Sequence, residues 1–121
     1  MEKELSVFKI GQTNDAYAKF FTGQSYLNML SLEQVVVGNV TFEPGCRNFC
    51  HIHHAKSGGG QILLCTAGRG YYQEWGKEAV ELNPGTSIAK CWNQLSFAAP
   101  CQCFYRSKLF KHVIFRTSCS R

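Results

Sequence analysis

Residues 50–68, CHIHHAKSGGGQILLCTAG, decide the fold that we expect for this chain. A histidine-rich strand-like run and an apolar run flank a run of glycines, and successive side chains of a β-strand point to opposite faces of a sheet. His51 and His53 would therefore share one face of the first strand, with their side chains about 7 Å apart. If the two runs pair as a hairpin, Gln61 on the second strand can face the two histidines. The pattern predicts a site at which three side chains meet.

The rest of the chain consists of similar short strand-like runs separated by turn residues. Residues 14–21 could form two helical turns with Asn14 as the N-cap, and residues 23–31 continue as an extended apolar arm. The strand-like runs are 34–43, 49–54, 61–67, 70–76, 78–82, 87–92 and 109–117. Turn sequences such as Asn83-Pro84-Gly85 lie between them. Many short strands within 121 residues predict a single all-β domain, a sandwich or a barrel.

Charge is distributed unevenly along the chain. All eight acids lie at or before Glu81, whereas residues 82–121 hold six of the thirteen bases and four of the seven cysteines. A basic arm for nucleic acid or an anionic membrane is one interpretation, and a solvated face is the other. We favour the solvated face, with no nucleic-acid or membrane partner, because no nucleic-acid motif accompanies the charge. No signal peptide and no membrane span is recognisable, so we expect a cytoplasmic protein with reduced thiols.

The spacing of glycine, histidine and glutamine residues between Gly45 and Gly68 resembles the first motif of the small single-domain cupins. That motif reads Gly, five residues, His-x-His, three or four residues, Glu, six residues, Gly. Here Gly45 is followed by five residues and then by His51 and His53, and Gln61 stands in the Glu position, with six residues between it and Gly68. The loop between His53 and Gln61 departs from the motif because it has seven residues, a length that a longer hairpin tip can absorb. The resemblance implies an all-β fold, the cupin-type double-stranded β-helix or jelly-roll barrel, with a short N-terminal helix and arm.

Two phrases, VTFEPGCRNF (40–49) and QILLCTAGRGYYQEWGK (61–77), resemble the cupin subgroup in which Gln replaces Glu. Members of that subgroup include manganese-dependent hydroxynitrile lyases and cupins associated with carboxymuconolactone decarboxylases. The implied division is an N-terminal helix and arm over 1–33 and a cupin barrel over 34–121, with 86–121 divergent. Cupins often form homodimers, and we expect one here.

The second cupin motif is incomplete in this chain. It begins correctly at Pro84-Gly85, but Cys91 stands where the motif has Pro and Ser96 where it has His. His112, in LFKHVIF, is the only histidine after His54, and relatives often carry a His in their last barrel strand. His112 is therefore either a metal ligand or a histidine that lines an apolar cavity.

The resemblance implies metal ligation by His51, His53, Gln61 and His112, with His53 and Gln61 as catalytic residues. Imidazole nitrogen and amide oxygen suit a divalent transition metal such as Mn, Fe, Zn or Ni. A metal ion without a carboxylate ligand keeps most of its charge, which favours Lewis-acid chemistry on a small polar carbonyl or cyanohydrin-like substrate. Lyase, isomerase and oxygenase reactions are all compatible with such a site. The alternative is a cupin without catalysis, either a small-molecule binding module or an inactive remnant.

The cysteines offer weaker candidates. Cys65 could act as a nucleophile, but a small buried apolar residue is the simpler interpretation. Cys101 and Cys103, together with Cys46 and Cys50, lack the spacing of a structural zinc site.

Overall fold

The computed structural model describes residues 7–49, 60–74, 76–91, 104–105 and 110–117, which form strands and one 3₁₀ helix. In chain order the elements are β1 (Gln12–Thr13), η1 (Asp15–Phe20), β2 (Phe21–Thr22), β3 (Ser25–Ser31), β4 (Val36–Phe42), β5 (Arg47–Asn48), β6 (Gly60–Ala67), β7 (Gly70–Tyr72), β8 (Val80–Leu82), β9 (Ser87–Cys91), β10 (Phe104–Tyr105) and β11 (Phe110–Thr117). The expected all-β character is confirmed.

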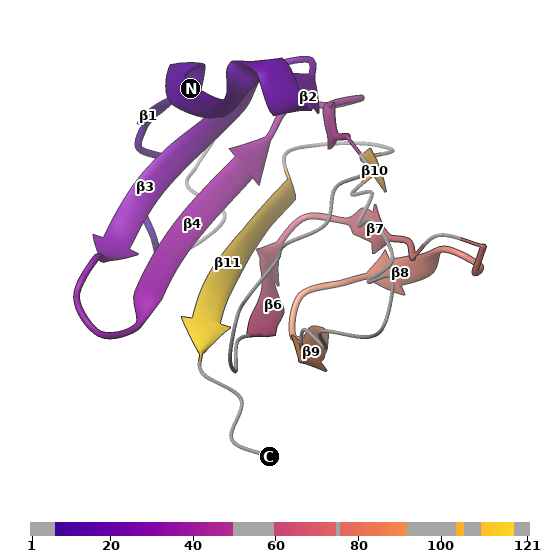
Figure 1. The fold of residues 1–121 in the computed structure, drawn as a ribbon. Helices are drawn as coiled ribbons and strands as arrows, with labels where there is room; N and C mark the ends of the chain where they lie inside the picture. The colour runs from indigo at the N-terminus through magenta and orange to yellow at the C-terminus, as the bar shows by residue number, and fades with distance from the viewer. Residues whose placement is uncertain (1–6, 50–59, 75, 92–103, 106–109, 118–121) are drawn as a thin grey trace.

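The strands form one large sheet and two small ones. The large sheet has six strands in the order β1-β3-β4-β11-β6-β9, and the small sheets are β10-β7-β8 and β2-β5. Figure 1 shows β7 and β8 beside β6 and β9, on the other side of the molecule from β3. All strand pairs are antiparallel, and β11 lies between β4 and β6 although it is the last of these strands in the sequence.

One apolar core joins the large sheet to the β7–β8 sheet. Its buried members, which we call the core cluster, are Val40, Phe42, Cys46, Leu63, Cys65, Tyr72 and Leu82. Val40 and Phe42 come from β4, and Leu82 from β8 is only 1% exposed. Because the contributing strands belong to different sheets, the two sheets pack face to face as in a β-sandwich.

Alternation along β6 explains which of its side chains enter this core. Leu63, Cys65 and Ala67 are buried, while Ile62 and Leu64 are only partly buried. This is the period of two that the sequence QILLCTA predicts for a strand. The same period places Gln61 in the set of Leu63 and Cys65, as the sequence indicated.

The N-terminal region, predicted as a helix and an arm, contributes strands β1 and β3 to the large sheet. Residues 15–20 form a 3₁₀ helix, and Asn14 stands at its N-cap position as predicted, although the Asn14 side chain makes no capping hydrogen bond. Asn14 instead donates from Nδ2 to Ser25 Oγ at 3.2 Å, which ties the helix to β3. The apolar run at 23–31 forms β3, which pairs with β4 along most of its length.

The turn predicted at Asn83-Pro84-Gly85 is confirmed, and it sets the position of β9. Thr86 N donates to Asn83 O at 2.8 Å, and Gly85 has a φ of 94°, a conformation that residues with a Cβ rarely adopt. Gly85 N also donates to Cys65 O at 2.9 Å. The turn is thereby fixed to β6, and β9 leaves it in register with residues 60–64.

Candidate functional site

The pairing of residues between neighbouring strands of the large sheet shows where two of the predicted site residues, Gln61 and His112, lie. In β4 the residues Val36, Gly38, Val40 and Phe42 form one alternating set, which contains the two core-cluster residues of that strand. A Cβ at Gly38 would lie 3.4 Å from side-chain atoms of Leu27 and Met29, so this face of the strand is closely packed. We call these positions, and the positions paired with them on neighbouring strands, the core side of the sheet.

Gln61 occupies a core-side position at the beginning of β6, and its side chain is half-buried. Its backbone pairs with Arg116 of β11 on one side and with Lys90 of β9 on the other. Arg116 in turn pairs with Val36 of β4. These four residues form one row across four strands, which we call the Gln61 row.

His112 lies at a different level of the sheet. Its backbone pairs with Val40 of β4 and Cys65 of β6, both of which belong to the core cluster. Cys65 is four residues beyond Gln61, which corresponds to about 13 Å along a strand. The register thus gives both candidate ligands core-side positions but sets their backbones apart along β6.

The other two predicted ligands, His51 and His53, lie outside the described residues. Within the part of the chain that the structure describes, no group of three or more His, Cys, Asp or Glu side chains is arranged to hold a metal ion. The described residues therefore do not form a metal site by themselves, and Gln61 is the described residue that fits one as an amide donor. The predicted ligand set and the catalytic roles of His53 and Gln61 stay predictions.

The large sheet carries an unbalanced charge. Its six strands contain three basic residues, Lys90, Lys111 and Arg116, and no acid. Two of the three bases are in the Gln61 row, whereas Lys111 pairs with Thr41 of β4 and, at an irregularity in the register, with Ala67 of β6. Sequence reasoning detected the basic C-terminal region but missed this row, because local periodicity does not reveal which distant strands pair.

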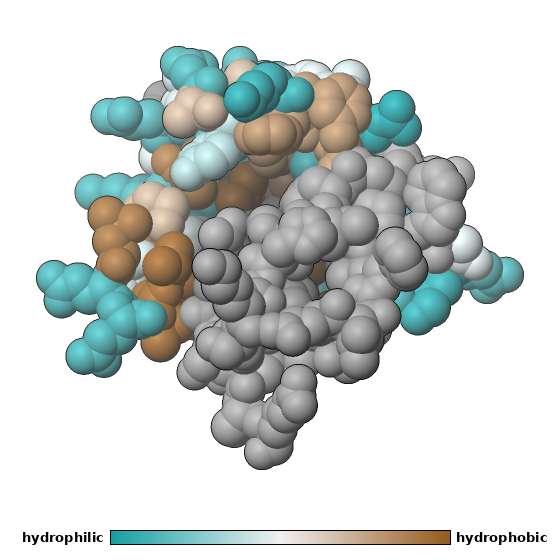
Figure 2. Space-filling model, viewed as in Figure 1, coloured by the Kyte–Doolittle hydropathy of each residue, from teal (hydrophilic) through white to brown (hydrophobic). Residues whose placement is uncertain are grey.

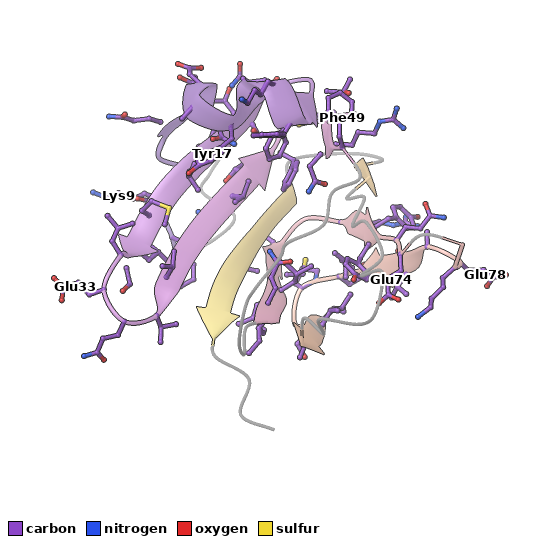
Figure 3. All side chains as sticks on the ribbon, viewed as in Figure 1. Lys9, Tyr17, Glu33, Phe49, Glu74 and Glu78 are labelled. Carbon is purple, nitrogen blue, oxygen red and sulfur yellow. The ribbon has the colours of Figure 1, made fainter. Side chains whose placement is uncertain are left out.

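Most of the described acids have partners away from the Gln61 row. Thr13 donates to Asp15, Tyr26 donates to Glu43, Lys77 pairs with Glu74, and Arg69 pairs with Glu81. Glu33 and Glu78 extend from opposite edges of the molecule (Figure 3). The hydrogen bond from Tyr26 Oη to Glu43 Oε1 is 2.6 Å long, and it raises the pKa of the Tyr26 phenol, with smaller contributions from burial and from the carboxylate charge.

The cysteines that the structure describes in detail are packed in the core. Cys65 is 4% exposed and Cys46 is 1% exposed, and both belong to the core cluster. Such burial is typical of cysteines that act as small apolar residues, and it keeps a thiol from substrate. The other cysteines of the considered zinc set, Cys50, Cys101 and Cys103, lie outside the described residues.

The packed antiparallel sheets, with a late strand inserted into the centre of the larger one, define the cupin-type jelly roll. A cupin-like protein of Thermotoga maritima shares this fold with a TM-score of 0.72 and 29% identity, over 93% of this chain and 80% of that one. A predicted oxalate decarboxylase of the same organism matches with a TM-score of 0.63 and 13% identity, over 96% and 95% of the chains. A sugar phosphate isomerase from a cupin superfamily, from Silicibacter pomeroyi, matches with 0.62 and 18%, over 94% and 68%.

The fold class predicted from the sequence is therefore confirmed, and solved structures that share it include cupin-like proteins. No protein-family model and no curated protein matches the sequence. The likeness to the Gln-containing subgroup and the divergence of residues 86–121 stay predictions. Among the described residues, no helix is long and apolar enough to cross a membrane.

Proposed function

We propose that this chain is a metal-binding cupin that acts as a Lewis-acid enzyme on a small polar carbonyl or cyanohydrin-like substrate. The observation that supports the proposal is the half-buried, core-side position of Gln61 at the beginning of β6. Gln61 follows His53 after seven residues, so the three proposed ligands come from neighbouring parts of the chain. The bound metal, Mn, Fe, Zn or Ni, would supply the polarisation of the substrate carbonyl.

The residues of the chain would bind and orient the metal and the substrate. Neutral imidazoles of His51 and His53 and the amide oxygen of Gln61 leave coordination positions open. His112, predicted as a fourth ligand, pairs with Cys65 at about 13 Å along the sheet from Gln61, so we leave it out of the proposed ligand set. Leu63 and Cys65 continue the core-side set of β6 beyond Gln61, and both are buried. This apolar neighbourhood would exclude water and strengthen the electrostatic interactions of a polar substrate. Enzymes occur among the proteins of this fold, which supports a catalytic role by analogy.

A non-catalytic binding module is the second candidate, and the Gln61 row favours it. The backbones of Lys90 and Arg116 pair with that of Gln61 on its two sides, so two basic residues occupy the strand positions next to the proposed amide ligand. Basic residues near a site disfavour a bound cation. In that case the barrel would bind a small molecule without metal-dependent chemistry.

Elemental analysis of the purified protein, before and after treatment with a chelator, tests the proposal. We expect one transition-metal ion per chain, and loss of that ion in His51→Ala and His53→Ala. His54→Ala is the matched control, because alternation assigns His54 to the opposite set, and it should retain the metal. A metal-free wild-type protein with a cooperative unfolding transition would refute the metal-dependent enzyme and leave the binding module. Equal metal loss in His54→Ala would refute the proposed ligand set.

We also propose that the chain forms a homodimer in the cytoplasm through the outer edge of β3. Within the described part of the chain, β1 pairs only with Tyr26 and Leu27, and Asn28 donates to Lys9 O, so residues 29–31 have no strand partner on that edge. Met29 and Leu30 are more than a third exposed, and Leu32 is 73% exposed. These apolar side chains contribute to the brown surface over the β3–β4 hairpin in Figure 2. Unpaired strand edges readily pair with a second copy of a chain, and light scattering would give the oligomeric state.

A further inference from the structure

Residues 7–13, which we call the N-terminal strap, run along the edge of β3 and then cross that strand (indigo beside β3 in Figure 1). Gln12 and Thr13 of β1 pair with Leu27 and Tyr26 at the edge. The chain leaves the edge at Gly11, which has a φ of 85°. A Cβ at Gly11 would lie 2.4 Å from Leu27 O, so the close approach of the strap to β3 requires glycine here.

Beyond Gly11, two side-chain amides hold one main-chain oxygen of the strap. Asn39 Nδ2 donates to Lys9 O at 2.9 Å, and Asn28 Nδ2 donates to the same oxygen at 3.2 Å. Asn28 of β3 and Asn39 of β4 are directly paired, and Asn39 is fully buried. Lys9 is labelled beside β3 in Figure 3. The strap is therefore bound across two strands through its backbone, and this bond does not depend on its side chains.

Little of the strap is buried. Phe8 and Ile10 are half-buried, the other strap residues are exposed, and none of the seven belongs to the core cluster. Segments with few buried apolar contacts open at a much smaller free energy than the whole domain needs to unfold. The strap can therefore open while the two sheets stay folded.

Opening of the strap would lengthen the available edge of β3. In the closed strap, β1 occupies the edge at Tyr26 and Leu27, and Asn28 is bonded to Lys9 O. These positions adjoin residues 29–31, the part of the edge that we propose to pair with a second copy of the chain. Opening would extend the pairing segment to residues 26–31, which is close to the usual strand length of about five to six residues.

We propose that the N-terminal strap guards the edge of β3 and thereby controls the association of this chain with a second copy. The inference rests on the proposed homodimer, whose interface the open strap enlarges. Covering a sheet edge is one of the ways in which proteins limit edge-to-edge pairing. The apparent dissociation constant equals the constant of the open chain divided by the open fraction, so a change that opens the strap strengthens the dimer.

Sedimentation velocity of the full chain over a concentration series tests the proposal. Gly11→Ala places a Cβ against Leu27 O and should displace the strap, which lowers the dissociation constant by about tenfold or more. Gly76→Ala is the matched control, because Gly76 has a φ of 71° and its Cβ would meet nothing within 4 Å. We expect its dissociation constant to stay within about twofold of wild type.

Two further variants keep the test decisive. If Gly11→Ala does not fold by circular dichroism, Asn28→Ala removes one of the two donors to Lys9 O and should also strengthen the dimer. Leu30→Lys in the Gly11→Ala background places a charge on the edge strand, where Leu30 is 39% exposed, and should abolish the gain. Strong association that persists in this double variant would place the interface elsewhere and overturn the guarded edge.

The same series distinguishes failure of the strap from failure of the homodimer. A folded Gly11→Ala with the dissociation constant of wild type, or an equal gain in Gly76→Ala, would overturn the strap whether or not wild type dimerises. A monomeric wild type beside a dimeric Gly11→Ala would refute the homodimer of the closed chain and support the strap.

Hydrogen exchange of the wild-type protein measures the opening directly. We expect amides of residues 7–13 to exchange at least about tenfold faster than amides of β4, because the strap opens without the sheet. Equal protection of the two segments would overturn a strap that opens independently.

Discussion

Thr41 carries a hydroxyl group whose cost the structure allows us to estimate. The residue is fully buried in β4, and its Oγ1 has no hydrogen-bond partner among the described residues. A buried hydroxyl without a partner costs about 1–3 kcal/mol, because its hydrogen bonds to water are lost without replacement. Thr41→Val exchanges the hydroxyl for a methyl group of nearly the same size and keeps a β-branched side chain in the strand. We therefore expect the free energy of unfolding to rise by about 1–2 kcal/mol.

The shift in melting temperature follows from the length of the chain. With about 2.1 cal/mol/K of unfolding entropy per residue, 121 residues give about 0.25 kcal/mol/K, so each 1 kcal/mol shifts Tm by about 4 °C. Thr41→Val should accordingly raise Tm by about 4–8 °C in differential scanning calorimetry. Urea titration at 25 °C would give the same difference as a free energy.

Two control substitutions separate the hydroxyl from other effects. Thr41→Ser keeps the hydroxyl and removes a buried methyl group, so it should destabilise the protein by about 1 kcal/mol. Thr22→Val makes the same exchange as Thr41→Val at an exposed strand position and should change stability by less than about 0.5 kcal/mol. An unchanged or lowered Tm for Thr41→Val would refute the reasoning, since it would mean that the hydroxyl is satisfied in solution.

Two other predictions concern β3 and its neighbours. Gly11 has a φ of 85°, and a Cβ there would lie 2.4 Å from Leu27 O and 2.7 Å from Asn28 Cβ, so Gly11→Ala should destabilise the protein by about 2 kcal/mol or more, measured by urea unfolding. Ser at this position should be equally harmful, and a neutral effect of either variant would contradict the close approach. The hydrogen bond to Glu43 raises the pKa of Tyr26 in the folded state. The stabilisation of the fold by this bond is therefore complete below the unfolded pKa of about 10, and it is lost as the pH rises through the raised pKa. The stability difference between wild type and Tyr26→Phe should therefore shrink from pH 9 to pH 11, and a constant difference would contradict the hydrogen bond.

Much of the fold could be predicted because its signals are local. The alternation in QILLCTA predicted a strand over 61–67, and the structure has β6 at Gly60–Ala67. The run at 70–76 was predicted too long, because β7 ends at Tyr72. Gln73 donates to the carbonyl of Lys77 at 2.9 Å, and Lys77 pairs with Glu74, so side-chain contacts fold this segment into a loop. The two-residue strands β1, β2, β5 and β10 are too short for any periodicity to indicate them.

The candidate site was less predictable, because it depends on pairing between strands far apart in sequence. The period of two placed Gln61 on the same side as Leu63 and Cys65, which the structure confirms through the burial of the latter two. No local pattern could indicate that Arg116, 55 residues later, pairs with Gln61. The pairing of His112 with Cys65 likewise depends on two strands that are far apart in sequence, so no local pattern could predict it.

The position of β11 has a consequence for the synthesis of the protein. This strand pairs with β4 over residues 110–116 and with β6 over residues 111–117, so it occupies the centre of the sheet. While the ribosome is still translating earlier codons, β4 and β6 each present a bare edge to the cellular milieu. The two halves of the sheet can therefore join only after nearly the last described residues have been synthesised, and we expect the open edges of β4 and β6 to be prone to aggregation until then.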